Sequence, residues 1–304
     1  MTEDNPDVPA AVPPAEPRAE PPTELGKKPV SNLTLRLATA GVLIPVLVIS
    51  GFVETTHWSI LACAVLAVFF AGDEYLRMTL GLGDTSKDRA IGLRATFGVA
   101  GAAIVIGNCQ LGTHTAMAPL LFGAAMILAT AVLARKRQLA NAGRDFAFAL
   151  SGLIYVPMMA CVWPLLKKEL GPEWLFLALA LAFSSDTAAY FAGRAFGKHK
   201  LYEAVSPKKT VEGAVGGLLG GVIATVGMGH FWLLPEISIS HGIVLGVLGS
   251  ALGQLGDLVE SMIKRTFGAK DSGNILPGHG GMLDRVDGLL FVAPLVYYYA
   301  RLML

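Results

Sequence analysis

Charged residues are scarce in this sequence. Of its 304 residues only 15% are Asp, Glu, Lys or Arg, whereas 53% are hydrophobic. Soluble globular domains carry about 25% charged residues, so this chain has too little charge to cover an ordinary water-exposed surface. The composition predicts a polytopic membrane protein, in which the positions of the few charges carry most of the information.

Cysteine is also rare, with three residues in the chain. Cys63, Cys109 and Cys161 each lie inside an apolar run, without a Cys-x-x-Cys spacing or a nearby histidine. This pattern suggests neither a disulfide framework nor a zinc site. We expect all three thiols to be packing residues.

Residues 1–30 lack any apolar run and are rich in Pro, Glu and Ala. Such a segment cannot bury enough surface to offset the entropy of ordering, so we expect a disordered cytoplasmic tail. It also lacks the basic start and apolar core of a signal peptide. We therefore divide the chain into this tail, 1–30, and a single transmembrane domain, 31–304.

Apolar segments dominate the second part. Helices need about 20 apolar residues to cross a bilayer, and several of the segments are somewhat shorter. The sequence predicts an all-α polytopic membrane protein with about nine transmembrane helices. The segments are roughly 33–53, 57–72, 91–107, 116–134, 146–166, 174–192, 213–234, 241–262 and 288–304.

The basic residues indicate an orientation for these spans. Short loops rich in Lys and Arg remain on the cytoplasmic side of a membrane. With nine spans and a cytoplasmic N-terminus, all of the 24 basic residues except Lys167, Lys168 and Arg301 belong to the cytoplasmic side. We therefore expect a cytoplasmic N-terminus and basic loops on the cytoplasmic side.

Glycine is frequent in the seventh and eighth segments, as at Gly213, Gly217 and Gly221 and at Gly242, Gly246. Spacings of three and four place these small residues along helix faces and allow close helix packing. The packing could occur around a site within one chain or in a homodimer.

Two regions place charges next to these glycine-rich segments. Asp186 lies within the sixth apolar segment, and a carboxylate at membrane depth is a functional candidate by default. Lys208 and Lys209 come just before the next span, where lysines and helix N–H groups can bind phosphate. The loop lacks the Gly-x-x-x-x-Gly-Lys-Ser/Thr pattern, which excludes a P-loop.

The eighth segment ends in polar residues. Asp257, Ser261 and Lys264 have the spacing i, i+4 and i+7, so they share one helix face. A terminal Asp-to-Lys pairing would explain Lys264 and the neighbouring Arg265. It leaves Asp257 deep in a glycine-rich span, and we therefore take Asp257 as a candidate site residue.

A polar stretch then continues to Asp287. Its glycines allow the backbone to approach an anion, and Asp257, Asp284 and Asp287 offer the oxygen ligands that Mg²⁺ prefers. Acids for a metal and bases for phosphate together favour a phosphoryl or nucleotidyl transfer site. His279 has no further His or Cys ligands for zinc, so we expect it to contact phosphate or nucleotide.

The stretch 261–287 resembles the phosphatidate cytidylyltransferase (CDP-diacylglycerol synthase) family. The family pattern is Ser-x-apolar-Lys-Arg-x4-Lys-Asp-x-small-x2-apolar-Pro-x-His-Gly-Gly-apolar-x-Asp-Arg-apolar-Asp, and every fixed position is met. The similarity extends back through Gly256-Asp257, residues 206–210 and Asp186-Thr187. Such a long match of mixed charge is highly specific.

The resemblance implies that CTP and phosphatidic acid react to CDP-diacylglycerol and pyrophosphate with Mg²⁺, with a second cation left open. It implies metal ligands at Asp257 and Asp284, and a catalytic group that adds Lys264, Ser261 and Asp287. The expected partners are the two substrates and membrane lipid, without nucleic acid. The expected location is the inner (plasma) membrane of a bacterium, with the catalytic loops of the transmembrane domain, 31–304, on the cytoplasmic side. The expected substrate-binding residues are Arg265, Lys270, Asp271, His279, Gly280, Gly281, Arg285, Lys208, Lys209 and Asp186.

Two other functional classes fit the sequence less well. CDP-alcohol phosphotransferases need an Asp-Gly-x2-Ala-Arg pattern, whereas Asp287-Gly288 is followed here by Leu-Leu-Phe-Val. A transporter with a charged gate would be expected to show inverted halves with matching broken helices, and no such repeat is present in the sequence.

Overall fold

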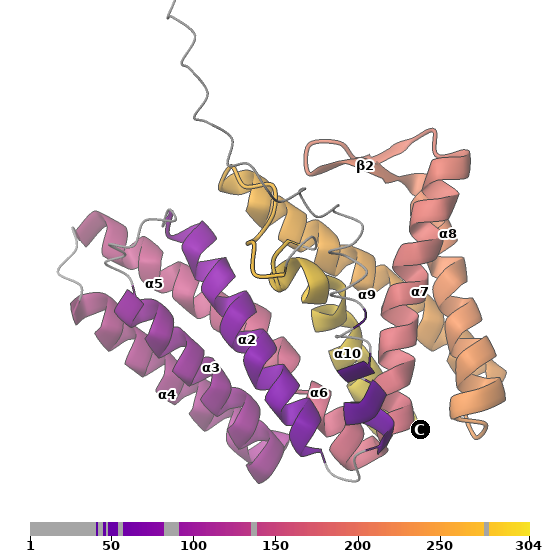
Figure 1. Ribbon diagram of the computed structural model, residues 1–304, viewed down its shortest axis with the longest axis horizontal. Helices are drawn as coiled ribbons and strands as arrows, with labels where there is room; N and C mark the ends of the chain where they lie inside the picture. The colour runs from indigo at the N-terminus through magenta and orange to yellow at the C-terminus, as the bar shows by residue number, and fades with distance from the viewer. Residues whose placement is uncertain are drawn as a thin grey trace, which may run out of the picture. The chain divides into compact units, whose positions relative to one another are not determined.

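The structure of the chain is a computed structural model, which describes residues 41, 45–46, 48–53, 57–81, 91–134, 139–276 and 280–304. The predicted tail, 1–30, lies outside the described residues. Figure 1 shows that the described part is built mainly of helices. In chain order the elements are η1 (Ile49–Val53), α2 (Trp58–Thr79), α3 (Ile91–Leu111), α4 (Thr113–Ala134), α5 (Leu139–Leu153), η2 (Ile154–Met158), α6 (Trp163–Leu165), η3 (Leu166–Leu170), α7 (Pro172–Phe196), β1 (Lys200–Tyr202), β2 (Ser206–Thr210), α8 (Val211–Ile223), η4 (Ala224–Leu233), α9 (Ile239–Thr266) and α10 (Leu283–Met303).

Eight helices within the described part are long and apolar enough to cross a membrane. Each coincides with one of the predicted segments, and α5, η2, α6 and η3 together form the fifth, Asn141–Leu170. The first predicted segment, 33–53, lies mostly outside the described residues, and its end forms η1. The chain is thus an all-α polytopic membrane protein.

The helices extend beyond the apolar segments into the polar stretch. α9 continues to Thr266, and α10 begins at Leu283, before the predicted start at 288. Asp284 and Asp287 therefore belong to the beginning of a helix instead of a loop. A carboxylate in a first helical turn is stabilised by the helix dipole, which explains why α10 begins before its apolar part does.

The helices of the described part form two packed groups. α2, α3, α4 and α5 contact one another in one group, and α7, α8, α9 and α10 form the other (Figure 1). α10 also contacts α2, so it joins the two groups. The core between the helices is apolar, with fully buried side chains such as Phe97, Leu181 and Leu290.

The glycines of α8 allow the close helix packing that their spacing predicts. A Cβ added at Gly216 would lie 2.2 Å from the Cβ of Ala192 on α7. At Gly221 it would lie 1.8 Å from the Ser250 Oγ on α9. Contact between these helices therefore requires glycine, because real Cβ atoms do not approach so closely. The role of glycine in packing within the chain is confirmed, and a homodimer stays a prediction.

Replacing Gly220 with alanine is expected to destabilise the protein by about 2 kcal/mol through overpacking. The new Cβ would lie 2.3 Å from the Ala188 Cβ and 2.8 Å from the Ser184 backbone oxygen. Gly227→Ala is the matched control, because no atom lies within 4 Å of a Cβ there. Thermal unfolding in detergent would measure both, and an equal or smaller loss for Gly220→Ala than for the control would contradict the packing account.

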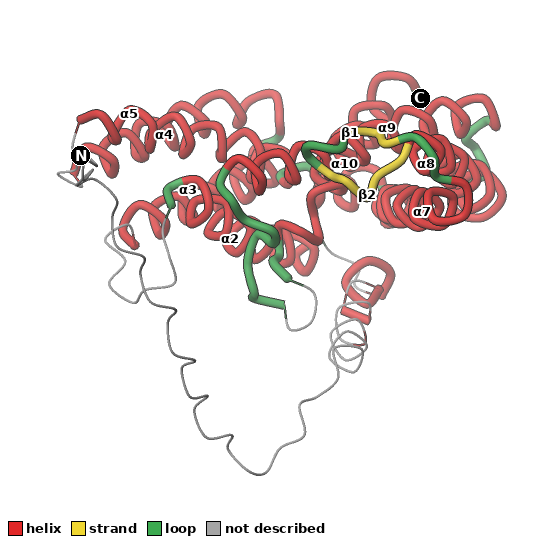
Figure 2. The backbone as a smooth tube through the Cα atoms, turned by 90° about the horizontal axis from the view of Figure 1, so that it is seen from above, coloured by secondary structure: helices red, strands yellow, loops and turns green. Residues whose placement is uncertain are grey.

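The basic loop between α7 and α8 contains a short antiparallel hairpin, which the sequence analysis did not predict. β1 pairs with β2 through Lys200↔Thr210 and Tyr202↔Ser206, and the hairpin contacts α8 and α9 (yellow in Figure 2). Thr210 is the N-cap of α8, where its side chain accepts a hydrogen bond from the Gly213 N–H at 3.1 Å. This cap marks the end of β2 and fixes the direction in which the chain continues into α8.

Candidate functional site

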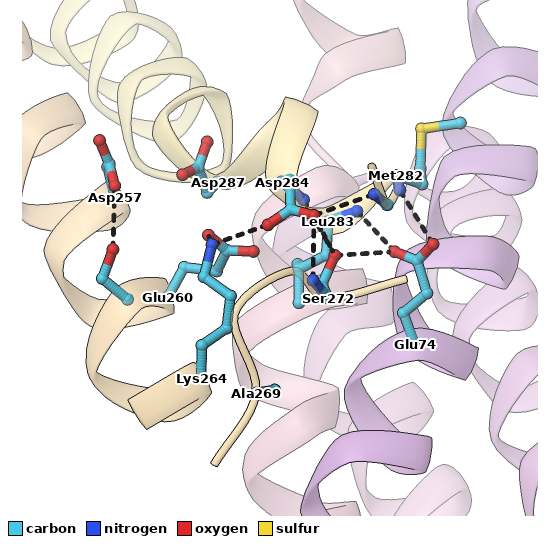
Figure 3. Close-up of polar contacts among 12 residues, drawn as sticks. Glu74, Asp257, Glu260, Lys264, Ala269, Ser272, Met282, Leu283, Asp284 and Asp287 are labelled. Atoms are coloured by element: carbon cyan, nitrogen blue, oxygen red, sulfur yellow. Dashed lines mark hydrogen bonds and ion pairs between the residues drawn. The ribbon is translucent and has the colours of Figure 1, made fainter. Parts of the chain in front are cut away.

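The polar ends of α9 and α10 lie side by side and carry a group of charged and polar residues (Figure 3). Their approach depends on Gly256, where an added Cβ would lie 2.6 Å from the backbone oxygen of Asp287. A larger residue at this position would push the two helices apart. The group consists of Asp257, Glu260, Ser261 and Lys264 on α9 and of Asp284 and Asp287 on α10.

Asp257 connects α9 to the hairpin. Its Oδ2 lies 2.6 Å from the Lys209 Nζ, and its Oδ1 accepts a hydrogen bond from the Ser261 Oγ at 3.3 Å. Both side chains of the ion pair are about a quarter to a third exposed, at 34% for Asp257 and 25% for Lys209. The fold thus brings together the basic turn and the end of the eighth predicted segment, and the carboxylate remains accessible.

Lys264 is a buried cation between two carboxylates. Its Nζ donates to the Glu260 Oε2 and, at 2.7 Å, to the Asp284 Oδ1. The Glu260 side chain is only 1% exposed and that of Asp284 9%. Lys264 therefore neutralises charge inside the protein and links α9 to α10. A role of its ammonium at a substrate phosphate stays a prediction.

Asp284 anchors the loop that connects the two helices. Its Oδ2 accepts hydrogen bonds from the backbone N–H groups of Ser272 at 3.0 Å and Gly281 at 2.9 Å, and from the Ser272 Oγ at 2.9 Å. Together with Lys264 these donors surround the carboxylate. Asp284 is thus well held, and few of its lone pairs remain for a metal ion.

Three carboxylates in the described part form a group that could hold a cation. Ligand oxygens of Asp257, Glu260 and Asp287 lie within 4.8 Å of one another. The buried Glu260 Oε1 has no hydrogen-bond partner among the described residues. Clustered carboxylates with an unsatisfied buried oxygen fit a divalent cation with oxygen ligands. Asp284, a predicted ligand, is not part of this group, and its predicted role as a ligand is not tested by the geometry alone.

Glu260 was missed by the sequence analysis. Its signal was present, because a carboxylate three residues after Asp257 lies next to it on a helix. Charges at the end of a membrane span are common, so Glu260 did not stand out in the sequence as a site residue.

The remaining predicted substrate-binding residues that the structure describes lie on α7, in the hairpin, and around the polar ends of α9 and α10. Asp186, on α7, is exposed and lies within electrostatic range of Asp257 and Lys209. His279 lies outside the described residues. Contacts of these residues with substrate stay predictions. Exposed side chains near the polar ends of α9 and α10 or in the hairpin are those of Lys208, Arg265, Lys270, Asp271 and Arg285.

The two glycines of the predicted anion-binding turn serve an internal contact. Gly280 has a φ of +83°, which favours glycine. A Cβ added at Gly281 would lie 2.1 Å from the Ser272 Oγ and 2.6 Å from the Glu74 Oε2. The space beside Gly281 is therefore filled by the protein's own polar groups.

Glu74, on α2, is a second residue that the sequence analysis missed. It is 2% exposed, and its carboxylate accepts hydrogen bonds from the backbone N–H groups of Met282 at 3.0 Å and Leu283 at 2.8 Å. Figure 3 shows the side chain pointing from α2 to the beginning of α10. A carboxylate pair, Asp73-Glu74, at the end of an apolar segment was the available signal.

The fold and the site define a class of protein: a polytopic membrane protein with a carboxylate cluster and lysines where its helices become polar. The model of the Cytidylyltransferase family matches residues 34–303. The chain belongs to this family.

Similar proteins agree with this membership. The chain is 44% identical over 154 residues to a protein of Staphylococcus aureus (strain COL) named "Phosphatidate cytidylyltransferase", a match that covers 50% of this chain and 58% of that protein. Proteins of the same name are 39% identical over 191 residues in Staphylococcus haemolyticus (63% of this chain, 69% of that protein) and 46% identical over 136 residues in Bacillus subtilis (44% and 49%). The chain thus spans somewhat more than half of the length of the S. aureus protein and about half of the length of the B. subtilis protein.

Proposed function

We propose that this protein is a phosphatidate cytidylyltransferase, which transfers CMP from CTP to phosphatidic acid and releases pyrophosphate. The observation that carries the proposal is the group of Asp257, Glu260 and Asp287 between Lys209 and Lys264, at the polar ends of membrane-spanning helices. Carboxylates for a cation next to lysines for phosphate suit transfer of a nucleotidyl group. The names of the similar proteins support the same substrates.

Mg²⁺ is the proposed cofactor, and Asp257, Glu260 and Asp287 are the residues proposed to hold it. This set is supported by the proximity of their oxygens and by the unpaired Glu260 Oε1. Asp284 is less suited than the sequence suggested, because its oxygens already accept from a lysine, a serine and two backbone N–H groups. When bound, Mg²⁺ would neutralise charge on the phosphate oxygens and on the leaving pyrophosphate.

The basic residues are proposed to bind and orient the two phosphate-containing substrates. Lys209 pairs with Asp257 in the described structure, and we expect its ammonium to turn to a phosphate oxygen when CTP binds. Lys208 precedes the N-terminus of α8, which favours anions. Exposed cations at the same polar ends, proposed to contact the nucleotide, are Arg265, Lys270 and Arg285.

The chemical step requires little from the protein beyond position and charge. An oxygen of the lipid phosphate forms a bond to the α-phosphorus of CTP while the bond from that phosphorus to the pyrophosphate oxygen breaks. No side chain forms a covalent intermediate in this scheme. The Ser261 hydroxyl donates to Asp257 and orients its carboxylate.

The proposed location is the inner membrane of a bacterium, with the site on the cytoplasmic face. The distribution of basic residues supports this orientation, and CTP is available on that side. Phosphatidic acid can keep its acyl chains in the bilayer while its head group reaches the polar ends of α9 and α10.

The test is an assay of the purified, folded protein in lipid–detergent micelles. We expect pyrophosphate release from CTP only when phosphatidic acid and Mg²⁺ are both present. In sealed vesicles, externally added CTP should be consumed only when the cytoplasmic face points outward. Release of pyrophosphate without phosphatidic acid, or no release from folded protein, would contradict the proposed function.

A further inference from the structure

We propose that Glu74 is a positioning residue for the cation site: a carboxylate of α2 that holds the beginning of α10, and with it Asp284 and Asp287, in place. The inference rests on the proposed function in that it assigns a cation to Asp257, Glu260 and Asp287. It extends the site to the first group of helices, which would otherwise be regarded as a membrane scaffold.

The first turn of α10 needs hydrogen-bond acceptors from elsewhere. A helix begins with N–H groups that have no partner within the helix, and the N-cap residue Met282 provides no side-chain cap. Glu74 accepts from the N–H groups of Met282 and Leu283 through its two different oxygens, at 3.0 and 2.8 Å. A residue more than 200 positions away in the chain thus caps α10, and its negative charge is favourable at a helix N-terminus.

Two glycines make room for this contact. A Cβ at Gly273 would lie 2.4 Å from the Glu74 Oε1, and one at Gly281 would lie 2.6 Å from the Glu74 Oε2. Any side chain at these positions would displace the carboxylate. The connecting loop is therefore shaped around Glu74, which is 2% exposed.

A continuous polar chain leads from Glu74 to the proposed cation ligands. The Ser272 Oγ lies 3.2 Å from the Glu74 Oε2 and 2.9 Å from the Asp284 Oδ2. Because a hydroxyl has a single proton, Ser272 can donate to one of these carboxylates at a time. Asp284 then contacts Lys264, which contacts Glu260 (Figure 3). Movement of the beginning of α10 would shift Asp287 relative to its two partners on α9.

The residue before Glu74 provides a matched control. Asp73 is a carboxylate of the same helix, and its ion pairs are with Arg77 on α2 and Arg94 on α3. Replacing Asp73 therefore removes a charge from the neighbouring position of α2, where the ion pairs are with α2 and α3 and not with α10.

The experiment compares Glu74→Gln with Asp73→Asn in purified protein. Glutamine has the size of glutamate, and it keeps one acceptor but presents an NH₂ group to a backbone N–H. We expect the Mg²⁺ concentration for half-maximal activity to rise about tenfold or more for Glu74→Gln, as for partners behind metal ligands, with kcat reduced. The rise of the unfolding temperature with added Mg²⁺ should shrink in parallel. Asp73→Asn should leave both Mg²⁺ responses unchanged, even if it lowers stability.

Each further outcome decides for or against this role. Unchanged Mg²⁺ responses in folded Glu74→Gln, or equal changes in Asp73→Asn, would overturn it. If Glu74→Gln does not fold, Glu74→Asp and Gly273→Ala are compared; wild-type Mg²⁺ responses in both would also overturn the role. If the wild-type protein proves inactive with CTP and phosphatidic acid, the proposed function fails, whereas the Mg²⁺-dependent unfolding temperature still tests Glu74.

Discussion

Replacing Asp257 with alanine is expected to reduce turnover to below about 1% of the wild-type rate while the protein remains folded, because a metal-assisted transfer loses a ligand at the reacting phosphates. Asp257 is half-buried, its ion-pair partner Lys209 is partly exposed, and its buried partner Ser261 is an uncharged hydroxyl. Its removal therefore leaves no deeply buried charge unpaired. Pyrophosphate release measures the rate, and thermal unfolding in detergent measures the folded state.

The control for this substitution is Glu203→Ala. Glu203 is an exposed carboxylate in the turn between β1 and β2, so its loss removes one negative charge near the site without touching the carboxylate group. We expect wild-type turnover for the control. If folded Asp257→Ala kept more than a few per cent of the wild-type rate, the assignment of Asp257 as a cation ligand would be wrong.

Replacing Lys264 with alanine is expected to affect stability and activity together. The buried carboxylates of Glu260 and Asp284 would lose their shared cation, and removing one partner from buried ion pairs costs about 3–5 kcal/mol. Turnover should fall about 100-fold or more, because α9 and α10 would no longer be held at a fixed separation. Thermal unfolding and the pyrophosphate assay measure the two effects.

The neighbouring Arg265 is the control for the stability effect. Its side chain is exposed and donates to the Ala269 backbone oxygen at 3.0 Å, so Arg265→Ala should change the free energy of unfolding by less than about 1 kcal/mol. A double variant, Lys264→Ala with Asp284→Asn, should regain part of the stability, because one unpaired carboxylate is removed as well. Equal stability losses for Lys264→Ala and Arg265→Ala would contradict the buried bridge.

Much of the fold was predictable because each span is specified by its own residues. The apolar segment 241–262 predicts a helix, and α9 is Ile239–Thr266. The ends of the helices were less predictable. α10 begins five residues before its apolar segment because its first N–H groups find acceptors: the distant Glu74 accepts from Met282 and Leu283, and the Ser272 Oγ accepts from Asp284. The hairpin in the loop after α7 was likewise not predicted, because hydropathy identifies apolar spans and not short strands in a polar loop.

The candidate site was predictable where its residues are close in sequence. The spacing of Asp257, Ser261 and Lys264 predicts one helix face, and the hydrogen bond between Asp257 and Ser261 agrees with it. The pairing of Lys209 with Asp257 joins two regions that the sequence analysis had selected separately. The ion-pair partners of the lysines could not be deduced from the sequence, because no local pattern tells which carboxylate a lysine will contact.

The sequence by itself determined the membrane class, the positions of eight described spans and a set of charged residues, because hydropathy and helical spacing are local properties. Only the tertiary structure decided which carboxylates lie together and which one is held by other protein groups. Asp257, Glu260 and Asp287 gather around one point, whereas Asp284 is bound by Lys264 and the loop. Glu74 enters the site from α2 for the same reason: the N–H groups at the beginning of a helix need acceptors, and the one that meets those of Met282 and Leu283 lies far away in the sequence.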